Sequence, residues 1–579
     1  MGAGVGATSV PAGRFFELTI LAQDPSVEDP QPKDHNKRIL RATARIPAHV
    51  VTPGPRGPRF HVVDYDPINR RLAPPFDLAV AQGTVPDPFA EASDEELKGD
   101  RRFHAQNVYV ITTRTLASFE FALGRRVPWA FGSHQLYLVP HAFQEANAFY
   151  ADTDQALLFG DYPAPDRVVY TCLSHDIVAH ETTHAILDGL RRRFEAPGLP
   201  DQPAFHEAFA DIVALLSVFS MQEVVDRLIA EREGGVLLEE DVTPDRLRRL
   251  SLVKMAEELG DAVHRQRGSG LRNSAELKPT EEWKDPGNAE WEEPHRRAEI
   301  LVAAVMGALI EIWTGRLRGL IQVGRLDRER AAEEGSKAAT HLLSMMIRAI
   351  DYCPPVEFEF ADFLDAVLLS DEQLAPDDEH HYRPTLIEAF GAFGIRPRTW
   401  PQPPSAVPAE AYVYRDFNYV ALRSEPEEAF RFVWENADVL GIDRSYYLKV
   451  EDVLPSVRIG PDGFVVAESV ADYVQQLEAT MDDLRALAPE PFGPLKDLPG
   501  DTPVKVWGGG TIVFDQFGRV KFHQFKRLDD WDRQSRRLQY LVRRGIRDTD
   551  GRFGFSLGAP AGMRFALYHQ PDETAGETW

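Results

Sequence analysis

Two histidines, His180 and His184, stand four residues apart in a segment whose residues recur at the spacing of a helix. Residues at positions i and i+4 share one face of a helix, so both imidazoles can reach one metal ion. Glu181, which directly follows the first histidine, can reach a water molecule bound to that metal. This pattern predicts a helix that carries two metal ligands. It constrains the fold more than any other feature of the chain.

A second helix is predicted from Ala204 to about Phe219, and it carries Glu207 and, one turn on, Asp211. Glu207 completes a set of two imidazoles and one carboxylate, which leaves a fourth zinc position for water, as in catalytic sites. Asp211 can hold a ligand histidine by its other ring nitrogen. Apolar residues surround both acids, so the helix is expected to be largely buried, and buried carboxylates need partners.

Composition narrows the function classes. The net charge is −26, and an acidic surface repels phosphate backbones, so nucleic acid is not expected as the main partner. Only two cysteines occur, Cys172 and Cys353, which excludes a disulfide framework and leaves histidine and carboxylate to hold zinc.

The chain has no apolar run of about 18 residues and no signal-peptide pattern. We therefore expect no membrane insertion and a cytoplasmic location, unless export follows a route without a cleaved signal.

Changes in periodicity and composition suggest five parts of the chain. Helices are also predicted after Pro294, over about 330–350 and over about 385–393, and a hairpin over 511–525. The segment Arg396–Ala409 contains five prolines and is interpreted as a linker. The expected parts are a β-rich N-terminal segment (1–104), a β-rich lobe that ends in the metal-binding helices (105–220), a helical lobe (221–396), the proline-rich linker (397–409) and a small α+β domain (410–579).

Several blocks of the sequence resemble the thermolysin family of zinc endopeptidases, over roughly residues 105–395. Four segments carry the resemblance, and they stand in the family's order: Asn147–Tyr150, Phe159–Asp161, Asp176–Asp188 and Glu207–Asp211. The resemblance implies an α+β, two-lobed fold and one zinc ion held by His180, His184 and Glu207.

The resemblance also implies roles for residues outside the metal-binding helices. Asn147 and Ala148 match the edge segment that grips the substrate backbone. Leu271 matches a residue of the substrate pocket, and Arg272 matches the arginine that binds the substrate carbonyl. His295 stands where the family has the histidine that stabilises the transition state.

The sequence departs from the family pattern at several positions. The loop Gly189–Pro203 contains no tyrosine, although the family has a tyrosine hydroxyl there, and His206 stands where an asparagine is typical. Asp176 matches one acid of a calcium site, but Val218 stands where another is expected, so a double calcium site is not predicted. No long pro-segment is expected before the motif.

The sequence therefore predicts a zinc-dependent peptidase, in the first place an endopeptidase, that acts on peptide or protein substrates. A zinc aminopeptidase has the same ligands but needs an acidic site for the free amine of its substrate, and no such segment stands out upstream. A binding protein on a retained peptidase scaffold is the other alternative, but it has no use for Glu181 beside the metal. Residues 410–579 are expected to select or tether a protein partner.

Overall fold

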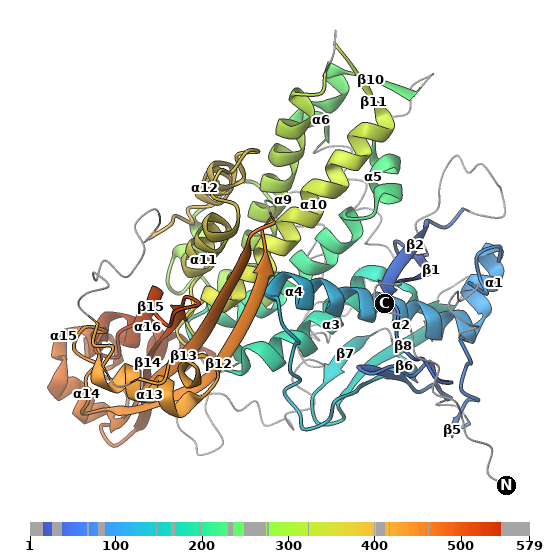
Figure 1. Ribbon diagram of the computed structural model, residues 1–579. Coiled ribbons are helices and arrows are strands. Elements are labelled where there is room, and N and C mark those ends of the chain that lie inside the picture. The colour runs from blue at the N-terminus through green and yellow to red at the C-terminus, as the bar shows by residue number, and fades with distance from the viewer. Residues whose placement is uncertain are drawn as a thin grey trace.

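The computed structural model describes residues 15–25, 38–66, 69–78, 87–145, 147–163, 168–195, 198–229, 235–247, 274, 277–321, 324–398, 400, 412–415, 417–460 and 463–545. The fold is mixed α+β, with 47% helix and 23% strand among the described residues, which is the class expected from the sequence. Figure 1 shows a β-rich part in blue to cyan, a group of long helices in green to yellow, and a C-terminal sheet in orange to red.

The β-rich part is built around one mixed sheet with the strand order β3–β6–β8–β7, and β9 pairs with β8. Strands β3, β6 and β8 are parallel, whereas β7 is antiparallel to β8. Because β7 is last in this order, it is an edge strand. The bounds are β3 (Phe60–Val62), β6 (Leu136–Phe143), β7 (Ala148–Ala151), β8 (Ala156–Pro163) and β9 (Val168–Tyr170).

A 23-residue helix, α2 (Arg101–Leu123), packs against this sheet and against the antiparallel hairpin β1 (Phe15–Leu21) and β2 (Arg41–Pro47). Its buried side chains include the polar Gln106, Asn107 and Thr112, which weakens the apolar periodicity and explains why the sequence does not predict it. The boundary expected between residues 104 and 105 falls inside α2, and β3 shares a sheet with β6. Residues on both sides of that boundary therefore belong to one lobe.

The long helices form the centre of the molecule. Helix α4 lies against both α3 and α9, and α10 also packs on α4. By length and composition α9 could cross a membrane, but 78% of its apolar window is buried inside the protein, so it is a core helix here. The bounds are α3 (His175–Leu190), α4 (Asp201–Phe219), α5 (Gln222–Leu228), α9 (Pro294–Arg318), α10 (Arg328–Ala349), α11 (Phe360–Leu374) and α12 (Tyr382–Ala392).

The C-terminal part is a four-stranded antiparallel sheet in the order β12–β13–β14–β15. The hairpin predicted over 511–525 is present, and Gly518 takes a positive φ of 77° in its turn. Helix α16 packs along β14. The bounds are α13 (Pro426–Glu435), β12 (Tyr447–Ile459), β13 (Val465–Thr480), α14 (Met481–Leu487), β14 (Pro503–Phe514), β15 (Val520–Lys526) and α16 (Trp531–Arg544).

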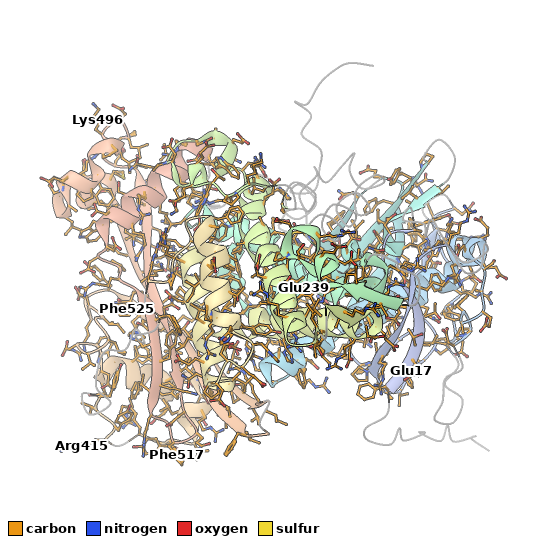
Figure 2. All side chains as sticks on the ribbon, turned by 90° about the horizontal axis from the view of Figure 1, so that it is seen from above. Glu17, Glu239, Arg415, Lys496, Phe517 and Phe525 are labelled. Atoms are coloured by element: carbon orange, nitrogen blue, oxygen red, sulfur yellow. The ribbon has the colours of Figure 1, made fainter. Side chains whose placement is uncertain are left out.

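Buried ion pairs join the C-terminal sheet to the rest of the molecule. Asp351, which is 1% exposed, accepts hydrogen bonds from Arg125 at 2.5 and 2.6 Å and from Arg458 of β12 at 2.7 Å. Arg191, just after α3, pairs with Asp472 of β13. Figure 2 shows this sheet, with Phe525 and Phe517, at the opposite end of the molecule from Glu17 of β1.

Candidate metal centre

Helix α3 presents His180 and His184 on one face, toward α4. Their Nε2 atoms lie 2.9 Å apart, and the two rings are nearly perpendicular, with centroids 4.5 Å apart. Both side chains are buried. Two ring nitrogens so close together can both face one cation, which the i, i+4 spacing predicts.

Helix α4 supplies the third donor, Glu207. Its Oε2 lies 3.6 Å from Nε2 of His180, and its Oε1 lies 3.7 Å from Nε2 of His184. One ligand atom from each of the three residues fits within 4.8 Å of the others. The fold therefore brings together the three expected ligands from two helices. Two imidazoles and a carboxylate are a donor set that suits zinc and leaves one position for water.

Each ligand histidine is held by its outer nitrogen. Nδ1 of His180 lies 2.8 Å from Oδ1 of Asp211, the hydrogen bond expected from the sequence. Nδ1 of His184 lies 2.8 Å from Nδ1 of His206, and these two rings stack. Such contacts fix the tautomer in which Nε2 keeps its lone pair for a metal.

His206 is a residue whose role the sequence did not reveal. The family that the chain resembles has an asparagine at this position. In the structure, Nδ1 of His206 contacts Nδ1 of His184. Burial lowers the pKa of His206 to about 4, so its imidazole is neutral at physiological pH. A neutral imidazole has one bare nitrogen, which can accept a hydrogen bond from His184.

Glu181 is fully buried beside the edge strand β7. Its Oε2 accepts a hydrogen bond from the backbone N–H of Tyr150 at 3.1 Å, and the hydroxyl of Tyr150 donates to Asp188 at 2.9 Å. Asn147 and Ala148 lie at the start of the same strand, where Oδ1 of Asn147 accepts from the Ala148 N–H. The carboxylate next to the metal ligands thus contacts the strand that is expected to bind substrate.

His295 lies in the first turn of α9, and the fold brings it to the metal ligands. Its Nε2 is 3.4 Å from Oε2 of Glu207, and its Nδ1 is 2.9 Å from Oε1 of Glu293, the N-cap of α9. Burial alone would lower the pKa of His295, but the carboxylates of Glu207 and Glu293 outweigh it and raise the pKa to about 9. A cation on Glu207 would offset part of this increase.

Not every predicted residue is placed at this centre. Leu271 and Arg272 lie outside the described residues. Asp176 accepts a hydrogen bond from the Ser174 hydroxyl, and Val218 is buried in the core. Phe194, from the loop that lacks a tyrosine, packs on Phe205 and Phe358.

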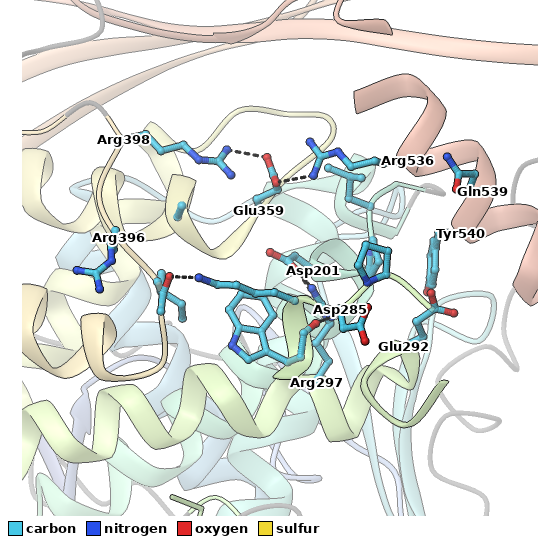
Figure 3. Close-up of a pocket in the computed structure, with 18 of the residues that line it drawn as sticks. Asp201, Asp285, Glu292, Arg297, Glu359, Arg396, Arg398, Arg536, Gln539 and Tyr540 are labelled. Atoms are coloured by element: carbon cyan, nitrogen blue, oxygen red, sulfur yellow. Dashed lines mark hydrogen bonds and ion pairs between the residues drawn. The ribbon is translucent and has the colours of Figure 1, made fainter. Parts of the chain in front are cut away.

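A pocket of about 510 Å³ lies elsewhere, between the helices and α16 (Figure 3). Its arginines face acids: Arg398 and Arg536 approach Glu359, and Arg297 pairs with Asp201. None of the three metal ligands lines it. Its lining carries six cationic and four acidic side chains, so the pocket is basic on balance although most of its charges are paired.

A comparison with models of known protein families finds no match to this chain, and a comparison with curated proteins finds no similar sequence.

Proposed function

We propose that the chain is a zinc-dependent peptidase with a thermolysin-like arrangement of its two lobes. In this proposal, the β-rich part and the helical part meet along α3 and α4, and an extended substrate binds against β7. The observation that carries the proposal is the convergence of His180, His184 and Glu207 on one point, with Glu181, the neighbour of His180 in the chain, hydrogen-bonded to β7.

Zinc, when bound by the three ligands, would lower the pKa of a water molecule and polarise the carbonyl of the scissile bond. Glu181 takes the proton of the attacking water and passes it to the leaving amine. Its hydrogen bond from the Tyr150 N–H orients the carboxylate relative to β7.

His295 acts on the negative charge that develops on the carbonyl oxygen. With Nδ1 held by Glu293, its protonated Nε2 is directed toward Glu207 and the cation position. Donors aimed at a site where charge appears only in the transition state contribute more than donors that merely bind substrate. Arg272 is proposed to contribute a second donor.

An endopeptidase fits this geometry better than an aminopeptidase. β7 is last in the strand order of the described residues, the position at which an extended peptide can add to a sheet. An aminopeptidase requires carboxylates that bind the free amine of the substrate. Of the two acids that hydrogen-bond to β7, Glu181 is used as the base and Asp188 accepts from the Tyr150 hydroxyl.

Digestion of unfolded proteins, followed by mapping of the cleavage sites, tests the proposal. The zinc-loaded wild type should cleave internal bonds, and Glu181→Gln with the same zinc content should not. N-terminally acetylated peptides should be cleaved as well. Cleavage confined to free N-termini would instead identify an aminopeptidase, and bound zinc without any cleavage would identify a binding protein.

A further inference from the structure

A second group of metal-ligating side chains lies in the β-rich part, away from the helix pair that holds the first. It consists of His104 of α2, His141 of β6 and Cys172, which lies in the 3-10 turn Thr171–Leu173 that leads into α3. One donor atom from each residue fits within 4.8 Å of the other two. All three side chains are at most 1% exposed.

The two imidazoles of this group also bring one nitrogen of each ring together, although the rings are tilted by 37° rather than nearly perpendicular. Nδ1 of His104 lies 2.8 Å from Nε2 of His141, which matches the 2.9 Å between the inner nitrogens of His180 and His184. The two imidazole nitrogens face each other in a buried space, and the Cys172 sulfur lies beside them. Three donor atoms therefore converge on one point.

The outer nitrogen of each imidazole contacts an acceptor. Nε2 of His104 lies 2.9 Å from the carbonyl oxygen of Lys98, and Nδ1 of His141 lies 2.7 Å from Oδ1 of Asp64. Arg101 holds Asp64 in turn through two nitrogens. Histidines that ligate metals are oriented in this way by a carbonyl or a carboxylate, and the inner nitrogen keeps its lone pair.

We propose that His104, His141 and Cys172 form a second metal site, which binds zinc or a similar thiophilic divalent cation. Two imidazoles and a thiolate suit zinc, and a thiolate distinguishes this site from the first, whose donors are nitrogen and oxygen. Binding replaces the thiol proton: the S–H bond breaks, the metal–sulfur bond forms, and the proton is released to solvent.

In this proposal the site has a structural role, because its donors come from a helix, a strand and the turn that leads into α3. It ties α2 and β6 to the turn that begins α3, the helix that carries His180 and His184. A metal bound only in the folded state stabilises that state, so this site fixes the start of the helix on which the first centre depends. A hydrogen bond between His104 and His141 would also explain the 2.8 Å contact between their nitrogens. It would not explain why the Cys172 sulfur lies beside them.

X-ray absorption at the zinc edge of the zinc-loaded wild type tests the proposal without any substitution. The first centre has no sulfur ligand, so a zinc–sulfur distance of about 2.3 Å can come only from a site with a cysteine. Nitrogen and oxygen neighbours alone, with no sulfur shell, would overturn the proposal.

Cobalt spectroscopy identifies the cysteine. Co²⁺ added to the metal-free His180→Ala/His184→Ala variant should produce a thiolate-to-cobalt charge-transfer band that saturates at one equivalent. Cys172→Ser in the same background should lose the band, while Cys353→Ser should keep it, because Cys353 is also buried but donates to the Ala349 carbonyl. A band that persists in Cys172→Ser or disappears in Cys353→Ser contradicts the assignment. None of these readouts depends on peptidase activity.

Discussion

Replacing His206 by leucine should weaken zinc binding at the first centre, although His206 is not itself a ligand. Nδ1 of His206 lies 2.8 Å from Nδ1 of His184. Because His184 is fully buried, an acceptor for its Nδ1–H must come from the protein. Leucine has a similar bulk but no acceptor.

The size of the effect follows from the tautomers of His184. A metal at Nε2 requires the lone pair there, so the proton must sit on Nδ1 in the bound state. In the metal-free state the proton can move to Nε2, and the loss of the acceptor then costs little. A buried donor that loses its acceptor costs about 1–3 kcal/mol. Since about 1.4 kcal/mol corresponds to a tenfold change, the affinity should fall by roughly five- to 150-fold.

Competition with a chromogenic zinc chelator measures this affinity directly. His206→Asn is the matched control, because its side-chain carbonyl can accept the same hydrogen bond, and it should keep most of the affinity. Circular dichroism of the metal-free proteins checks that all variants fold. Wild-type affinity in His206→Leu would refute the reasoning, and equal losses in both variants would point to ring packing rather than the hydrogen bond.

Three other substitutions test separate parts of the structure. Asp211→Ala, which removes the partner of His180, should lower zinc affinity about 10–100-fold, and unchanged affinity in chelator competition would count against that contact. His295→Ala should lower turnover about 10²–10³-fold at unchanged zinc content, and full activity would exclude its role. Asp351→Asn leaves the buried Arg125 without its anion and leaves Arg458 with Glu468 alone, so chemical denaturation should show a loss of about 3–5 kcal/mol. Burial opposes ionisation of Asp351, but the two arginines outweigh it and hold its pKa below the usual value. The stability that ionised Asp351 contributes is therefore present above the pKa of about 3.9 that an aspartate has in the unfolded chain, and it is lost as the pH falls through the folded-state pKa. The difference in unfolding free energy between wild type and Asp351→Asn should therefore become smaller in acid.

The first centre was predictable because its parts are local. His180 and His184 are one helical turn apart, and Glu207 and Asp211 are one turn apart on the next helix. Periodicity therefore places each pair, and only the packing of α3 on α4 is left to the fold. His295 is distant in sequence, and only the resemblance to a known family indicated it.

Other features depend on contacts that no spacing encodes. His104, His141 and Cys172 come from a helix, a strand and a turn, so no motif connects them before the sheet and α2 are assembled. Polar residues on the buried face of α2 obscure its periodicity. The docking of the C-terminal sheet rests on Asp351, Arg125 and Arg458, which are far apart in the chain and look like ordinary surface charges in the sequence.

The central claim is that Glu181 acts as a base beside a zinc ion held by His180, His184 and Glu207. Turnover of a peptide blocked at both ends, measured for zinc-loaded wild type and zinc-loaded Glu181→Gln, tests it most directly. We expect the wild type to cleave an internal bond, to lose activity on chelation and to regain it with zinc. Glu181→Gln should keep its zinc and turn over about 10²–10⁴-fold more slowly. Equal rates in the two proteins, or no cleavage by the zinc-loaded wild type, would contradict the claim.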